Sequence, residues 1–184
     1  RLLTPNDFGL IAMVLTCSLL FQNFGVNGFI EAIIQREEIN HKLVSTLFWI
    51  NIGCSLMLTL LFMALAPIIS LFFKEPRLTL ISFAISFSIL LSGMSTHHLA
   101  LLMRNMEFFK TSVNFVVATI ISISIAITLA YWGWGYWALV TRWVVLPLSI
   151  TVGGWILCRW RPGLPARGTE VMPMLKFAFS TYAN

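Results

Sequence analysis

Long apolar stretches alternate with short polar breaks along the whole chain. The hydrocarbon core of a membrane is about 30 Å thick, so a helix needs roughly 20 apolar residues to cross it. Five stretches meet this length, and they predict spanning helices over residues 8–34, 43–65, 78–103, 111–132 and 136–158. A further apolar run, residues 174–184, predicts the start of another helix. The pattern therefore predicts an all-α fold, a polytopic transmembrane helix bundle.

The second apolar stretch is longer than one crossing requires, because it continues to Phe73. Pro67 falls inside it, and proline removes a backbone N–H and disfavours a helix interior. We therefore expect the spanning helix to end near Leu65 and an interfacial turn to follow. The breaks between the helices are short, which predicts antiparallel neighbours. Residues 159–173 are rich in proline and glycine and are predicted to link two helical bundles.

The composition excludes an ordinary soluble domain. Hydrophobic residues make up 58% of the chain and charged residues only 10%, whereas about a quarter of the residues in soluble domains are charged. The net charge of +5 is spread between the apolar stretches, so no nucleic-acid partner is predicted. The cysteines lie inside apolar runs without C-x-x-C spacing, so neither a disulfide framework nor a zinc site is predicted. Because the chain opens without Met and stops inside an apolar run, we interpret it as a piece of a longer protein.

Basic residues predict how the bundle is oriented, because cytoplasmic loops of membrane proteins carry an excess of Lys and Arg. One alternate set of breaks holds most of them: Arg36, Lys42, Arg104, Lys110, Arg159, Arg161, Arg167 and Lys176. The other set holds only Arg1, Lys74 and Arg77. The sequence therefore predicts a multi-pass protein of the bacterial inner membrane, with Gln35–Lys42, Arg104–Lys110 and Arg159–Lys176 cytoplasmic and the Arg1 side periplasmic.

Polar residues recur along one side of each of the first three predicted helices. They form three stripes: Thr16, Asn23, Asn27 and Glu31; Asn51, Ser55 and Thr59; and Ser82, Ser86, Gly93 and His97. Such a side faces either protein or water. Small and hydroxyl residues are the common contacts between transmembrane helices, which favours packing for the Ser, Thr and Gly positions. For Asn23, Asn27 and Asn51, packing and a water-filled substrate path both stay open.

Ionisable residues inside the predicted spans are candidates for function. Arg142 lies roughly 9 Å inside the outer boundary and Glu31 roughly 6 Å inside the cytoplasmic one, at 1.5 Å per residue. An arginine at that depth favours a wet cavity or an anion, although its long side chain also reaches the interface. His97 and His98 point about 100° apart on a helix, so one is expected to face a lumen and the other to pack. No metal site is predicted, because no Cys, Asp or Glu stands at ligand spacing beside them.

Enzyme motifs are missing from the sequence. It contains no G-x-S-x-G, no H-E-x-x-H and no glycine-rich phosphate loop, and its Glu pairs fall at loops or helix ends. The sequence therefore favours transport or a structural role over catalysis, and it predicts no cofactor.

Seven strings in order resemble the polysaccharide-export flippases of the multidrug/oligosaccharidyl-lipid/polysaccharide (MOP) exporter superfamily. They are RLLTPNDFG (1–9), AIIQREEIN (32–40), STLFWIN (45–51), LAPIISLFFKEPRL (65–78), LLMRNMEFFK (101–110), GYWALV (135–140) and WRP (160–162). The resemblance covers essentially the whole chain. It implies an N-terminal lobe, like that of the multidrug exporters of the superfamily, within a protein of twelve or more helices.

The resemblance also implies a function. Such a protein flips undecaprenyl-pyrophosphate-linked oligosaccharide repeat units across the inner membrane by alternating access, for exopolysaccharide, capsule or O-antigen export. Its partners would be the lipid-linked oligosaccharide, membrane lipid and other polysaccharide assembly proteins. Within this picture the substrate-path candidates are Arg142, Asn23, Asn27 and Asn51, and the ion-coupling candidates are Glu31, His97 and His98. This sequence departs from the resemblance at two candidate positions. Relatives usually have an uncharged small or amide residue where this chain has Arg142, and often a basic residue where it has His98. Both departures weaken any transfer of a substrate site from the family.

Three alternatives stay open at this stage. A multidrug or toxin antiporter of the same superfamily would export cations and favour an acidic cavity, whereas the deepest charge here is Arg142. A peptidoglycan-precursor flippase of the same superfamily is the second alternative. A membrane-embedded glycan polymerase or ligase belongs to another class and would carry a long catalytic loop, which these residues lack.

Overall fold

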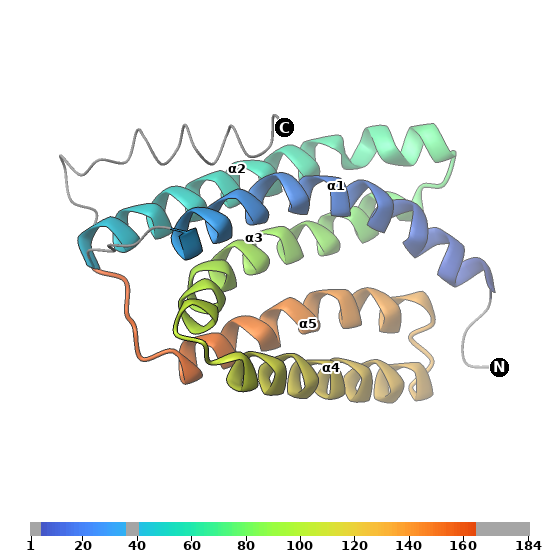
Figure 1. Ribbon diagram of the computed structural model, residues 1–184. Helices are drawn as coiled ribbons and strands as arrows, with labels where there is room; N and C mark the ends of the chain where they lie inside the picture. Colours follow the sequence, from blue (N-terminus) through green and yellow to red (C-terminus); the bar gives the residue numbers. More distant parts are fainter. Residues whose placement is uncertain (1–4, 36–40, 165–184) are drawn as a thin grey trace.

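The computed structural model describes residues 5–35 and 41–164, with side chains described for residues 7–22 and 41–164. These residues form five helices: α1 (Pro5–Gln35), α2 (His41–Phe73), α3 (Arg77–Arg104), α4 (Phe108–Tyr131) and α5 (Tyr136–Leu157). Consecutive helices run antiparallel, and α3 lies between the α1–α2 pair and the α4–α5 pair (Figure 1). The all-helical prediction is confirmed.

Four of these helices, α2 to α5, are long and apolar enough to cross a membrane. The part of α1 with described side chains supplies a shorter apolar helix, Asp7–Gln22. The predicted helix start over 174–184 and most of the predicted linker over 159–173 lie outside the described residues. Membership of a larger lobe therefore stays a prediction.

The second helix does not end near Leu65, which corrects our expectation from Pro67. α2 continues through the proline to Phe73. Three of the residues beyond it are apolar and outward-facing; Ile68 is 59%, Leu71 77% and Phe72 79% exposed. In lipid, backbone groups must be hydrogen-bonded within the chain, so continuing the helix costs less than a turn among apolar side chains. Pro67 removes one helical hydrogen bond without ending the helix.

Three helices end in the same turn geometry. After α2, the N–H groups of Lys74 and Glu75 donate to the carbonyls of Leu71 and Ser70, at 3.3 and 3.1 Å. The ends of α3 and α4 repeat this pattern of hydrogen bonds, which places one residue in the left-handed region. That residue is Gly133 after α4 but Lys74 and Met106 after α2 and α3, with φ of 57° and 58°. Only one of these three stops was therefore signalled by a glycine in the sequence.

The apolar core lies where α1, α2, α3 and α5 meet. α3 contributes the largest share through Leu78, Ile81, Ile85 and Ile89, and the other helices add Leu10, Ile11, Val14, Phe62 and Val140. Half of the most apolar window of α3 is buried, whereas the corresponding share is 17% in α2 and 28% in α4. α3 is thus the centre of the bundle, and α2 and α4 present most of their apolar surface outward.

Candidate functional site

The polar stripes of α2 and α3 meet each other. Asn51 is fully buried, and its Nδ2 donates to the carbonyl oxygen of Gly93 at 2.8 Å. A methyl group at Gly93 would lie 2.6 Å from the Cβ of Ser55, so the two helices approach closely there. The contact is the small-residue packing that transmembrane helices commonly use.

Two further side chains join the remaining helices through backbone carbonyls. Thr151 of α5 donates to the carbonyl of Leu91 in α3 at 2.9 Å. Asn114 of α4 donates to the carbonyl of Ile150 in α5 at 3.1 Å. Together with the Asn51 bond, these contacts link α2, α3, α5 and α4 in series. The buried amides and hydroxyls therefore hold the helices together.

Both histidines are buried in an aromatic cluster between α2, α3 and the end of α5. The ring of His98 lies 4.7 Å from that of Trp155 and 5.5 Å from that of Trp160. The ring of His97 lies 5.6 Å from that of Phe48, at nearly a right angle. Both residues are 0% exposed, so the expectation that one of them faces a lumen finds no support in this geometry.

Arg142 lies in a different environment, at the end of the bundle where α4 stops and α5 begins. It is half-buried and lines a hollow of about 350 Å³ between α1, α4 and α5. The other lining residues are apolar: Phe8, Ile123, Ala126, Ile127, Ala130, Ala138 and Leu139. The guanidinium carbon lies 5.9 Å from the centre of the Trp143 ring, within the range of a cation–π contact. Within the described residues, no carboxylate forms an ion pair with it.

The four candidate residues whose side chains the structure describes do not converge on one site. Arg142 lines the hollow just described, whereas Asn51 lies in the α2–α3 contact and His97 and His98 lie in the aromatic cluster. The side chains of Asn23, Asn27 and Glu31 lie outside those that the structure describes. Within its described part, the structure brings no three His, Cys, Asp or Glu side chains together as metal ligands.

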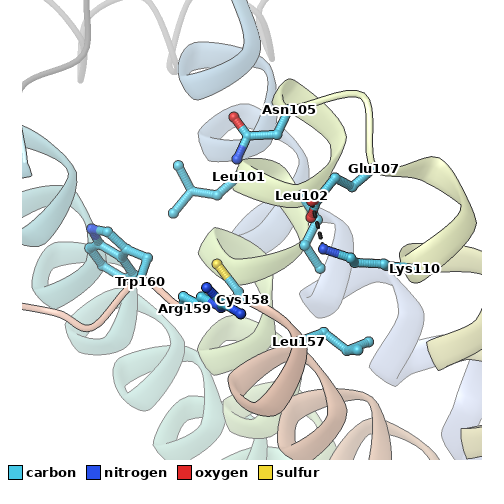
Figure 2. A pocket seen from close by; sticks show the side chains of 9 residues that line it. All are labelled: Leu101, Leu102, Asn105, Glu107, Lys110, Leu157, Cys158, Arg159 and Trp160. Atoms are coloured by element: carbon cyan, nitrogen blue, oxygen red, sulfur yellow. Dashed lines mark hydrogen bonds and ion pairs between the residues drawn. The ribbon is translucent and has the colours of Figure 1, made fainter.

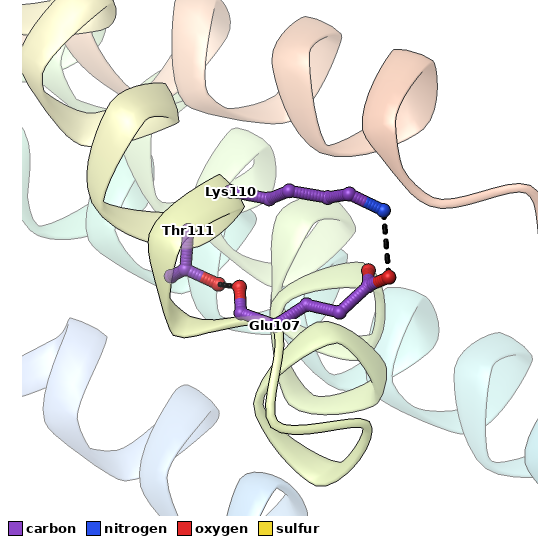
Figure 3. A network of polar contacts seen from close by, with 3 residues as sticks. All are labelled: Glu107, Lys110 and Thr111. Atoms are coloured by element: carbon purple, nitrogen blue, oxygen red, sulfur yellow. Dashed lines mark hydrogen bonds and ion pairs between the residues drawn. The ribbon is translucent and has the colours of Figure 1, made fainter.

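A second pocket, which sequence reasoning missed, lies at the opposite end of α5. Its volume is about 440 Å³, and its charged lining residues are Glu107, Lys110 and Arg159 (Figure 2). Lys110 donates to Glu107 at 2.6 Å, and the Glu107 carbonyl accepts from Thr111 at 3.3 Å (Figure 3). The sequence predicts Glu107 and Lys110 in the polar break at residues 104–110 and Arg159 in the segment after the fifth helix. The sequence held one indication of this pocket, because both predicted segments lie on the same side of the membrane.

Burial raises the pKa of the Cys158 thiol, which also lines this pocket, above its ordinary value. The thiol is therefore neutral at physiological pH. This neutral group joins the leucines in the apolar part of the lining.

Comparison with known proteins gives a consistent family. The sequence profile of a family described as polysaccharide biosynthesis protein matches residues 1–184, the whole chain. The chain is 26% identical over 179 residues to the succinoglycan biosynthesis transport protein ExoT of Rhizobium meliloti (strain 1021), covering 97% of this chain and 36% of ExoT. It is 24% identical over 179 residues to the lipopolysaccharide biosynthesis protein WzxC of Escherichia coli (strain K12), covering 96% of this chain and 36% of WzxC. No solved structure matches the chain.

Proposed function

The chain belongs to the polysaccharide biosynthesis protein family, and we propose that it forms part of a transporter that flips lipid-linked oligosaccharides across the bacterial inner membrane. The names of two relatives support this proposal: one is a transport protein and the other a lipopolysaccharide biosynthesis protein. The chain spans about a third of the length of these relatives, 36% in both cases. The proposed activity is therefore that of the whole protein.

The hollow beside Arg142 is the observation that carries the proposal at the level of residues. A permanent cation inside a membrane-spanning helix is costly and marks a functional site by default. Here the cation lines a hollow whose other walls are apolar. A pyrophosphate headgroup would pair with the guanidinium, while the prenyl tail would contact apolar side chains.

The remaining roles follow from the same proposal. Alternating access between this bundle and a second one would expose the substrate path to each side in turn. Asn23 and Asn27 would contact sugar hydroxyl groups, and Glu31 would couple the movement to an ion gradient. Asn51 has less room for such a role, because its side chain is fully buried and its Nδ2 already donates to the carbonyl of Gly93.

The distribution of basic residues supports a cytoplasmic placement for one end of the bundle. We call it the basic end; it is formed by the starts of α2 and α4 and the ends of α3 and α5. Its described basic residues are Lys42, Arg104, Lys110, Arg159 and Arg161, whereas the described part of the opposite end carries Lys74 in a turn and Arg77 at the start of α3. The excess at the basic end favours the cytoplasmic side.

The charge of Arg142 also separates the proposal from its main rival. An exporter of cationic drugs would have to move a positive group past this guanidinium, which like-charge repulsion opposes. An anionic cargo is attracted by the same group. Transport of an anion-linked glycan is therefore favoured over drug export.

The test uses the full-length protein that carries this sequence, in cells that depend on it for surface polysaccharide. Arg142→Ala is expected to reduce surface polysaccharide at least tenfold and to accumulate lipid-linked repeat units on the cytoplasmic face. Arg142→Lys should retain part of the activity because it keeps the charge. Arg77→Ala, a matched change at the start of α3, should leave export unchanged. Normal export by an Arg142→Ala protein present at normal levels would remove this residue from the substrate path.

A further inference from the structure

The pocket at the basic end lies where three chain segments meet at the membrane boundary. α3 ends at Arg104, α4 begins at Phe108 and α5 ends at Leu157. The pocket opens between these three ends and has a volume of about 440 Å³. Since the apolar spans stop here, the pocket lies at the depth of lipid headgroups rather than at the bilayer centre.

The pocket combines charged and apolar walls. Arg159 and Lys110 line it from different segments; Figure 2 shows the Lys110 nitrogen at the Glu107 carboxylate and the Arg159 side chain beside Cys158. Asn105 adds an amide, while Leu102 and Leu157 supply apolar surface. Side chains of this kind match a ligand with an anionic head and a hydrocarbon tail.

The charge of the pocket is positive. Arg159 and Lys110 contribute two positive charges and Glu107 one negative charge, which leaves +1. Glu107 is already paired with Lys110 at 2.6 Å. Both side chains of this pair are partly exposed, 46% for Lys110 and 35% for Glu107, so the pair is weak and exchanges readily with another anion. Arg159 is exposed.

The segment that carries Arg159 is held on both sides. The N–H of Cys158 donates to the carbonyl of Gly154 at 2.9 Å. Further along, the carbonyl of Gly163 accepts from Trp49 Nε1 at 2.9 Å, and the Gly163 N–H donates to Ser45 at 3.0 Å. These contacts fix the segment against α5 and α2. The backbone of Arg159 is thereby positioned before any ligand binds, which lowers the entropy cost of binding.

We propose that this pocket binds the phosphate headgroup of an anionic lipid, with Arg159 and Lys110 contacting the phosphate. Leu102 and Leu157 contact the first carbons of the tail. Basic pockets between transmembrane helices at the cytoplasmic surface bind such headgroups in other proteins. Two lipids present this chemistry, an anionic membrane phospholipid and a polyprenyl pyrophosphate carrier.

This site is separate from the hollow at Arg142, which lies at the opposite end of α5. Lipid binding is measured without transport, so the site and the proposed transport function are tested independently. Loss of export in Arg142 variants and loss of lipid binding in Arg159 variants are distinct results.

The experiment measures lipid binding to the full-length protein in detergent by native mass spectrometry, with phosphatidylglycerol or phosphatidylcholine added at equal concentration. Arg159→Gln should weaken phosphatidylglycerol binding about fivefold, the effect of one basic residue near an anionic surface. Glu107→Gln should strengthen it, because it releases Lys110 from its partner. Arg77→Gln, at the opposite end of the bundle, is the matched control and should change nothing. Binding of zwitterionic phosphatidylcholine should be equal in all variants.

The opposite signs expected for Arg159→Gln and Glu107→Gln protect the test from misfolding, which would lower binding in both. Equal phosphatidylglycerol binding by Arg159→Gln and Arg77→Gln would overturn the proposal, as would a loss in both pocket variants. A polyprenyl pyrophosphate competitor then identifies the source. Displacement of phosphatidylglycerol that depends on Arg159 assigns the site to the carrier lipid, and lack of displacement assigns it to the phospholipid.

Discussion

The close approach of α2 and α3 at Gly93 gives the sharpest test of the structure. A methyl group at this position would lie 2.6 Å from the Cβ of Ser55 and closer still to its Oγ. The Cβ of Ser55 is fixed by the helix backbone, so side-chain rotation cannot relieve the contact. We therefore expect Gly93→Ala to push the two helices apart and to destabilise the bundle.

The expected magnitude follows from two contributions. Overpacking of a well-packed contact costs about 1–3 kcal/mol. Separating the helices also lengthens the 2.8 Å bond from Asn51 to the Gly93 carbonyl, and a polar contact between transmembrane helices is worth about 0.6 kcal/mol on average. The higher helix propensity of alanine returns about 0.5–1 kcal/mol. The net loss in the free energy of unfolding is about 1–3 kcal/mol.

The assay is equilibrium unfolding of the full-length protein by SDS in mixed micelles, with two further variants. Gly53→Ala is the matched control, because a methyl group there meets nothing within 4 Å, so it should be neutral or slightly stabilising. Ser55→Gly combined with Gly93→Ala removes the clashing atoms and should recover most of the lost stability. Equal stability of the Gly93→Ala and Gly53→Ala proteins, or no recovery in the double variant, would refute the close approach.

Two further predictions concern the α3–α4 turn and the Cys158 thiol. Met106→Gly should raise the free energy of unfolding by about 1 kcal/mol, because a non-glycine residue at positive φ costs about 1–2 kcal/mol. The side chain of Met106 is 76% exposed, so its removal loses little contact. A lower free energy of unfolding in the SDS assay would contradict this prediction. In a variant without Cys17 and Cys54, maleimide labelling of Cys158 should be slow at pH 7 and should still rise beyond pH 9, because burial raises the pKa of this thiol and only the thiolate reacts. A labelling rate that levels off below pH 8.5 would show that the thiol is not buried as described.

Helix positions were largely predictable because they depend on local composition. The predicted breaks at residues 74–77 and 104–110 agree with the ends of α2 and α3 and the starts of α3 and α4 within a few residues. A charged or polar break of a few residues is enough to end a span, since charged groups are costly in hydrocarbon. The exception is Pro67. Proline usually ends a helix in water, but α2 continues past it to Phe73 because unpaired backbone groups are costly among lipid-facing side chains.

The candidate site was predictable only in part. Arg142 stood out in the sequence as a charge within a predicted helix, and it lines a hollow in the structure. Asn51 stood out equally, yet its amide joins α2 to α3. Asn51 lies on a helix face that contacts a neighbouring helix, whereas Arg142 lies on a face that borders a hollow. The type of residue does not predict which of these faces it occupies. The proposed substrate path therefore depends on Arg142 and not on Asn51.

Amino-acid order alone indicated that lipid surrounds this protein, and it predicted the number of helices in the described part and most of their ends, with the end of α2 as the exception. These properties follow from the free energy of moving each segment from water to lipid, which adds up residue by residue. The tertiary structure decided which polar groups meet. Asn51 reaches Gly93 across 42 positions, and Lys110 shares a pocket with Arg159 from another helix end. Such contacts depend on how the packed helices are rotated and spaced. The volumes of the side chains in all the helices together set this rotation and spacing.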